Sequence, residues 1–408
     1  MSTRPLSSAL RSLGGCHGPS GRLMACPWRQ FSSTPTRAVS AIFSETENVE
    51  LNAILKNIQE TIILPAYLPE KQRRIVFDPK KRTYMEQNPI VIDVEGLEHK
   101  FSTIDRFKDI ENSKKLLAQA LSKMQSPAEW SNLATLLAGY RKAGIRLQAD
   151  HWGKMVRMAG ETGNIQAIIE CAKQADKTGF SLGRRETAVR TLVYINEKAS
   201  RQMHAHALGA LRAAEVVLDM LQRPEHARAA KRTRNSLPFS RIIRGITLFT
   251  RSAACNVKLA SRDEGVDQDL LLLEDEVALF RSLWKGPLPD DLTQLREFAE
   301  LNATLDRNSG RKIPRALNGF CYVQALAQGI RGTILAEELL GDKAKDLARV
   351  REALEKHVHE FVQTAPGRSQ GWIDEYELVT GKRLELQSAP KQEPDKAPAP
   401  ASEQENSV

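Results

Sequence analysis

The fold of this chain is decided by residues 150–184, which read DHWGKMVRMAGETGNIQAIIECAKQADKTGFSLGR. The spacing of the apolar residues predicts two short amphipathic helices joined by a turn at Gly163. The segment ends in Lys177-Thr178-Gly179-Phe180, and the same frame of lysine, small residue, glycine and apolar residue occurs upstream in Lys142-Ala143-Gly144-Ile145. Glycine just past the last periodic residue ends a helix, because it enters the left-handed region without steric cost. Two helices within a period of 35 residues predict a helical-hairpin array.

Helical periodicity extends outward from this segment over most of the chain. Apolar faces recur from about residue 110 onward, and prolines and glycines separate them. The predicted helices after the central hairpin cover 186–198, 208–221, 242–259, 270–284, 292–305, 314–340 and 343–364, with a final turn at 371–379. We therefore predict an all-α fold, an irregular α-solenoid with an extended N-terminal arm.

The N-terminal arm is predicted from residues 45–109. A helix over 45–64 ends at Pro65 and is followed by a basic, irregular stretch over 71–82. Residues 89–101 read as two short extended segments around Glu95-Gly96, which fit either a small β-hairpin or an arm lying on a partner.

The first 31 residues have the composition of a mitochondrial transit peptide. They contain Arg4, Arg11, Arg22 and Arg29, many serines and no acidic residue, whereas the first acidic residue is Glu45. We predict cleavage between Phe31 and Ser32 and a location in the mitochondrial matrix. The alternative is a basic arm on a protein of another compartment.

The predicted organisation follows these changes in composition. After residue 386 the chain is rich in proline, alanine and glutamate, which predicts disorder. The predicted regions are a transit peptide, a helix with a basic arm, a hairpin array, a basic linker, a C-terminal helical region and a tail, with ranges 1–31, 32–109, 110–222, 223–244, 245–386 and 387–408.

The segment 150–184 resembles one complete pentatricopeptide repeat, flanked by half-repeats, so that the similarity covers residues 130–198. In that family one or two side chains per repeat read each RNA base. The resemblance puts the first reading position at Gly153 and the second near Gly183 or Arg184. Glycine has no side chain to bind a base edge, so the resemblance implies a helical-hairpin scaffold of mitochondrial gene-expression proteins without the reading code.

Two basic segments are the candidate sites for RNA, because lysine and arginine neutralise phosphates and release counterions. Each also fits a plain solvated loop. The first is the linker 223–244 and the second is the stretch 71–82; their candidate residues are Arg223, Arg228, Lys231, Arg232, Arg234, Arg241 and Arg244, and Lys71, Arg73, Arg74, Lys80, Lys81 and Arg82.

No residue pattern in the chain predicts catalysis, a cofactor or a metal. The five cysteines form no CxxC or Cys/His cluster, and the histidine pairs His204/His206 and His357/His359 have the wrong spacing for one helix face. Phosphate-binding glycine loops and nucleophile motifs are absent, as is any apolar stretch long enough to span a membrane.

The formal net charge of +9 favours acidic partners. We therefore expect a non-catalytic protein of mitochondrial gene expression that binds mitochondrial rRNA or mRNA, mitoribosomal proteins, or both. The alternatives are a protein-only scaffold for assembly of a respiratory-chain complex and a helical enzyme without a recognisable motif.

Overall fold

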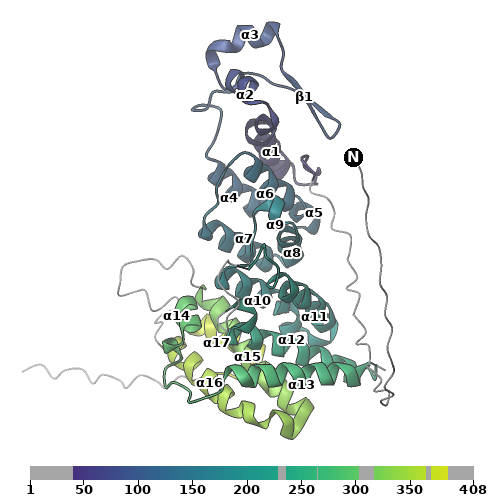
Figure 1. Cartoon of the computed structure of the whole chain (residues 1–408), viewed down its shortest axis with the longest axis vertical. Coiled ribbons are helices and arrows are strands. Elements are labelled where there is room, and N and C mark those ends of the chain that lie inside the picture. The colour runs from purple at the N-terminus through teal and green to yellow at the C-terminus, as the bar shows by residue number, and fades with distance from the viewer. Residues whose placement is uncertain (1–39, 228–235, 264, 303–316, 364–368, 385–408) are drawn as a thin grey trace, which may run out of the picture. The chain divides into compact units, whose positions relative to one another are not determined.

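The computed structural model describes residues 40–227, 236–263, 265–302, 317–363 and 369–384 (Figure 1). These residues are mostly helical, which confirms the predicted all-α hairpin array. The predicted transit peptide with Phe31 and Ser32, residues 228–235 of the predicted linker and the predicted tail lie outside the described residues. One hydrophobic core extends from Leu51 to Val379 and crosses several of the predicted region boundaries, which stay predictions.

The first described helix begins at a capped residue and changes its winding before a proline. The Asn48 side chain accepts a hydrogen bond from the Leu51 amide at the start of α1 (Val49–Ile58), and Leu51 and Leu55 are buried. A π-helical turn, η1 (Gln59–Ile63), and a 3₁₀ turn, η2 (Leu64–Tyr67), follow. Pro65 lies in the first turn of η2, where a missing amide hydrogen is tolerated.

Residues 71–82, for which the sequence predicts an irregular backbone, lie mostly in short helices. These are α2 (Glu70–Val76), η3 (Pro79–Lys81) and α3 (Arg82–Gln87). Glu70 and Arg74, one turn apart, pair at 2.5 Å, and Asp78 caps η3 through the Lys80 amide. Helices of two turns are too short to show a clear apolar period, so the sequence pattern did not reveal them.

The extended segments form a β-hairpin of two strands, β1 (Val91–Val94) and β2 (Leu97–Lys100). Val94 pairs with Leu97, and the connecting residues Glu95 and Gly96 both have positive φ, 53° and 84°. A two-residue turn with this backbone matches the twist of antiparallel strands. A small second core fixes the hairpin against α2 and α3; it contains Val76, Met85, Ile90, Val94, Phe101 and Ile104.

The predicted hairpin array occupies the middle of the chain. Ser126 and Glu129 form a reciprocal capping box at the start of this array's second helix. The predicted array, 110–222, begins with α4 (Ser113–Lys123), α5 (Pro127–Trp130), α6 (Leu133–Lys142), α7 (Ala149–Glu161), α8 (Ile165–Lys173) and α9 (Ala175–Thr178), and its last two helices pack with the C-terminal half.

The predicted glycine stops are confirmed by the backbone. Gly144, Gly163 and Gly179 have φ of 76°, 71° and 72°. At the first stop the Ile145 amide donates to the Tyr140 carbonyl at 2.9 Å, which is the closing bond of a Schellman motif. The repeated sequence frame therefore marks equivalent ends of α6 and α9.

The C-terminal half is a bundle around two long helices, α12 and α15. They approach closely because both carry glycine at the contact: a Cβ on Gly332 would lie 2.5 Å from the Phe249 amide nitrogen. The helices of this half are α10 (Arg185–Arg201), α11 (Met203–Met220), α12 (Arg241–Ala260), α13 (Val266–Leu283), α14 (Arg296–Leu301), α15 (Gly319–Leu340), α16 (Ala348–Gln363) and α17 (Ser369–Thr380), with 3₁₀ turns η4 (Leu237–Phe239), η5 (Leu292–Gln294) and η7 (Gly341–Leu347).

Candidate nucleic-acid interface

The α2–α3 surface comprises the six predicted cations of residues 71–82. Their side chains extend from two short helices and the 3₁₀ turn between them; all are exposed except the half-buried Arg73. Arg74 pairs with Glu70, whereas the other five form no ion pair with any described residue. The predicted cations of this segment are therefore solvent-accessible side chains on three consecutive helical elements.

Aromatic side chains accompany these cations. The Arg106 guanidinium lies 4.5 Å from the centre of the Phe77 ring, which adds a seventh cation that the sequence pattern did not single out. Tyr84 is 49% exposed and Phe107 is 97% exposed, so two aromatic rings face solvent on the same part of the chain. The main-chain bond from the Ile104 amide to the Val76 carbonyl, 2.8 Å, ties the Arg106 segment to α2.

The predicted residues of the linker are not brought together as one free basic surface. Arg223 pairs with Asp219 across one helical turn at 2.6 Å. Arg228, Lys231, Arg232 and Arg234 lie outside the described residues. The last two, Arg241 and Arg244, form the first turn of α12 and point into the protein.

Arg241 is held by an acidic residue of α14. Its Nη1 lies 2.9 Å from Glu297 Oε1, and its backbone amide donates to Glu297 Oε2 at 2.9 Å. The guanidinium also lies 5.3 Å from the centre of the Trp284 ring. Glu297 is therefore neutralised by Arg241 at the start of α12.

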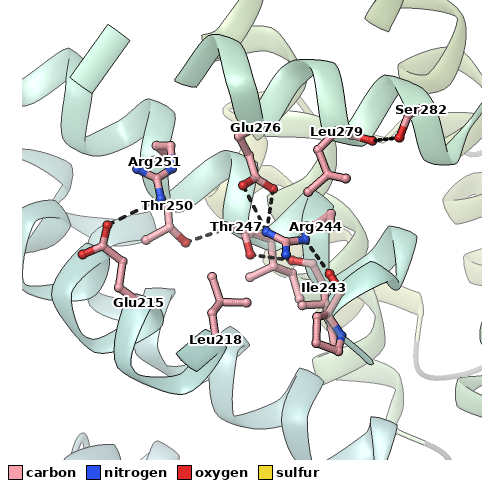
Figure 2. A network of polar contacts seen from close by, with 12 residues as sticks. Glu215, Leu218, Ile243, Arg244, Thr247, Thr250, Arg251, Glu276, Leu279 and Ser282 are labelled. Atoms are coloured by element: carbon pink, nitrogen blue, oxygen red, sulfur yellow. Dashed lines mark hydrogen bonds and ion pairs between the residues drawn. The ribbon is translucent and has the colours of Figure 1, made fainter. Parts of the chain in front are cut away.

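Arg244 is held by α13 in the same way (Figure 2). Its Nη1 lies 3.1 Å from Glu276 Oε2, and its Nε donates to the Pro238 carbonyl at 2.6 Å. Two helical turns further along α12, Arg251 forms an ion pair with Glu215 of α11 at 3.4 Å. These arginines join α12 to its neighbours, so their charge is matched within the fold.

The repeated Lys-small-Gly frames meet at a cavity of about 490 Å³. Lys142 and Lys177, the lysines of the two frames, both line it, together with Arg141, Tyr67 and Glu95. Arg141 Nη1 donates to the Ala175 carbonyl at 2.8 Å, which connects the end of α6 to α9. The sequence shows that the Lys-small-Gly frame is repeated. Only the stacking of the hairpins shows that Lys142 and Lys177 line the same cavity.

The two glycines at the base-reading positions face other parts of the protein. A Cβ on Gly153 would lie 2.9 Å from Glu186 Oε1, and a Cβ on Gly183 would lie 2.5 Å from the His226 carbonyl oxygen. Glu186 in turn pairs with Arg190 at 2.7 Å, both side chains being buried. These glycines permit close packing between segments of the protein.

Groups that support chemistry in other proteins are buried or scattered. Burial raises the pKa of the Cys255 thiol to about 11 and that of the Cys321 thiol to about 12, and it also raises the pKa of Cys171. These thiols are therefore protonated at neutral pH. Among the described residues, acidic, histidine and cysteine side chains form no group able to hold a metal ion, and no helix is long and apolar enough to cross a membrane.

The fold and the α2–α3 surface define a class: a mostly helical protein with exposed cations on short N-terminal helices. The Mrp13 family model, described as mitochondrial ribosomal protein mS27, matches residues 29–379, and the chain belongs to this family. Family membership confirms the predicted mitochondrial localisation.

A relative from Neurospora crassa, named small ribosomal subunit protein mS27, is 30% identical over 207 residues. The aligned part covers 50% of this chain and 52% of the relative, so the similarity spans about half the length of each protein.

Proposed function

We propose that this chain is a structural component of the small subunit of the mitochondrial ribosome, in contact with ribosomal RNA and neighbouring ribosomal proteins. The family match over residues 29–379 carries this proposal. A scaffolding role fits two features of the fold. Its buried arginines form ion pairs that join neighbouring helices, and its described thiols are protonated. The proposal includes the absence of catalysis and of a cofactor.

The α2–α3 surface is the proposed RNA contact. Its unpaired cations are exposed, apart from the half-buried Arg73, so they bind phosphates without first breaking an internal ion pair. The exposed rings of Tyr84 and Phe107 suit contacts with unpaired bases. The linker residues Arg228, Lys231, Arg232 and Arg234 stay part of the proposal, whereas the internal pairs of Arg241 and Arg244 favour a structural role for those two.

We also infer a pentatricopeptide-like origin for residues 130–198, in which the hairpins act as a scaffold. The glycine stops at equivalent helix ends support the likeness, and the packing of Gly153 against Glu186 argues against base reading at that position.

The first experiment asks where the protein sediments. An epitope-tagged chain, expressed in mitochondria, is followed through a sucrose gradient before and after RNase treatment. Co-sedimentation with small-subunit rRNA, and a shift to light fractions after RNase, is the expected result. Sedimentation with inner-membrane complexes, unchanged by RNase, would instead favour the protein-only scaffold.

The second experiment tests the surface. Replacing Lys71, Lys80, Lys81 and Arg82 by glutamine is expected to weaken RNA binding and to flatten its dependence on salt, because each lost phosphate contact lowers the slope by about one. The matched control replaces four exposed lysines elsewhere, namely Lys56, Lys154, Lys285 and Lys356. Equal loss of affinity in both variants would show that net charge, and not this surface, determines binding.

A further inference from the structure

The cavity at the two repeated frames has a mixed chemistry that RNA-backbone binding alone does not explain. Arg141, Lys142 and Lys177 line it together with Glu95. None of the three cations forms an ion pair with a described residue. A volume of about 490 Å³ lies within the range of small-ligand sites, about 300–1,000 Å³.

Tyr67 supplies an aromatic ring at the cavity. Tyr67 is 37% exposed, and the Lys142 ammonium lies over its ring, 5.1 Å from the ring centre. This cation–π contact is weak at an exposed site. A planar base that stacks on the ring can displace the ammonium, which is then free to bind a phosphate.

Glu95 is fixed in the turn of the β-hairpin with one oxygen still available. Its Oε2 accepts hydrogen bonds from the Ser40 hydroxyl at 2.6 Å and the Ala41 amide at 2.9 Å. Its Oε1 accepts none from a described residue. A carboxylate oxygen accepts hydrogen bonds only, so it suits the amino group of a base.

Resting on the proposed function, we propose that this cavity receives a single unpaired nucleotide of the bound RNA. The base stacks on Tyr67 and donates its amino group to Glu95, and the flanking phosphates lie against Arg141 and Lys177. Unstacked bases in loops and bulges are the usual targets of such aromatic platforms. An acidic protein segment fits less well, because Glu95 would repel its carboxylates.

The test uses the purified full-length chain and two labelled RNA hairpins, one with a single bulged adenosine and one fully paired. We expect the bulged hairpin to bind at least about fivefold more tightly, as base–aromatic stacking provides. Tyr67→Leu should remove this preference and Glu95→Gln should reduce it, whereas Tyr67→Phe, which keeps the ring, should retain it. Unchanged thermal midpoints verify that the variants are folded.

Matched lysine variants test the phosphate contact. Lys177→Gln should weaken binding of the bulged hairpin and lower its salt slope by about one. Lys154→Gln removes an exposed lysine that does not line the cavity. It should leave unchanged the preference for the bulged hairpin over the paired one. With 8-azidoadenosine, which keeps the amino group, at the bulge, ultraviolet crosslinking should label the peptide that contains Tyr67.

The outcomes separate this inference from the proposed function. If both hairpins bind through the α2–α3 surface and Tyr67→Leu changes nothing, the inference is overturned and the proposed RNA contact stands. If neither hairpin binds, both are overturned. If a poly-glutamate peptide binds the wild-type chain and binds more tightly to Glu95→Gln, the cavity takes an acidic protein segment instead.

Discussion

Replacing Arg244 by glutamine should destabilise the protein and leave RNA affinity unchanged. The side chain carries one of the predicted RNA-binding charges, yet it is only 13% exposed and points at Glu276, which is 7% exposed. The substitution removes the cation but leaves the buried carboxylate. An uncompensated buried charge is the dominant cost of such a change.

The magnitude follows from the burial of the pair. Removing one partner of a buried ion pair costs about 3–5 kcal/mol of unfolding free energy. Because both groups of this pair retain some exposure, we expect the lower end, about 3 kcal/mol. Each kcal/mol lowers the thermal midpoint by about 2 °C in a long chain, which gives a decrease of about 6 °C.

The assay combines thermal unfolding with RNA binding for three variants. Arg244→Gln should lower the free energy of unfolding and leave RNA affinity unchanged. The double variant with Glu276→Gln should recover part of the lost free energy, with a coupling energy between the two residues of about 1–3 kcal/mol. Lys80→Gln, at an exposed position, should behave in the opposite way: its stability stays within about 0.5 kcal/mol of wild type while RNA affinity falls.

A contrary result is well defined. If Arg244→Gln melted within 1–2 °C of wild type, on the order of the measurement error, and lost RNA affinity as Lys80→Gln does, then the pair with Glu276 would not hold in solution. The separation of structural from RNA-binding arginines would then be wrong.

Three further predictions concern the packing and the buried titratable groups. Gly160→Ala should cost about 1–3 kcal/mol, measured by denaturant unfolding, because its Cβ would lie 2.2 Å from the Tyr194 ring; unchanged stability would show that the ring can move. Burial lowers the pKa of His357, so the unfolded chain binds a proton more readily than the folded protein. Stability should therefore fall as the pH decreases below about 6.5, and less so in His357→Gln, as thermal midpoints across that range would reveal. Iodoacetamide at pH 8 should leave Cys255 and Cys321 unmodified in the native protein and label both in guanidinium chloride, as peptide mass spectrometry would show; native labelling would contradict their burial.

Local features of the sequence were sufficient for the hairpin array. Gly144 and Gly179 end their helices in the left-handed region as the repeated frame predicts, because a helix stop depends on a few adjacent residues. The β-hairpin at Glu95-Gly96 likewise follows from a local turn preference. The short helices α2 and α3 were not evident, since two turns give too little periodicity and their packing on the hairpin stabilises them.

The sequence by itself determined the helical architecture, the repeated frame and the basic composition of this protein. The tertiary structure decided which cations are free. Arg244 and Arg241 meet carboxylates 32 and 56 residues further along the chain, whereas Lys80 and Lys81 meet none among the described residues. The physical reason is that helix ends are set by neighbours in sequence, but the neutralisation of a charge depends on whatever side chain the fold brings within a few ångströms of it.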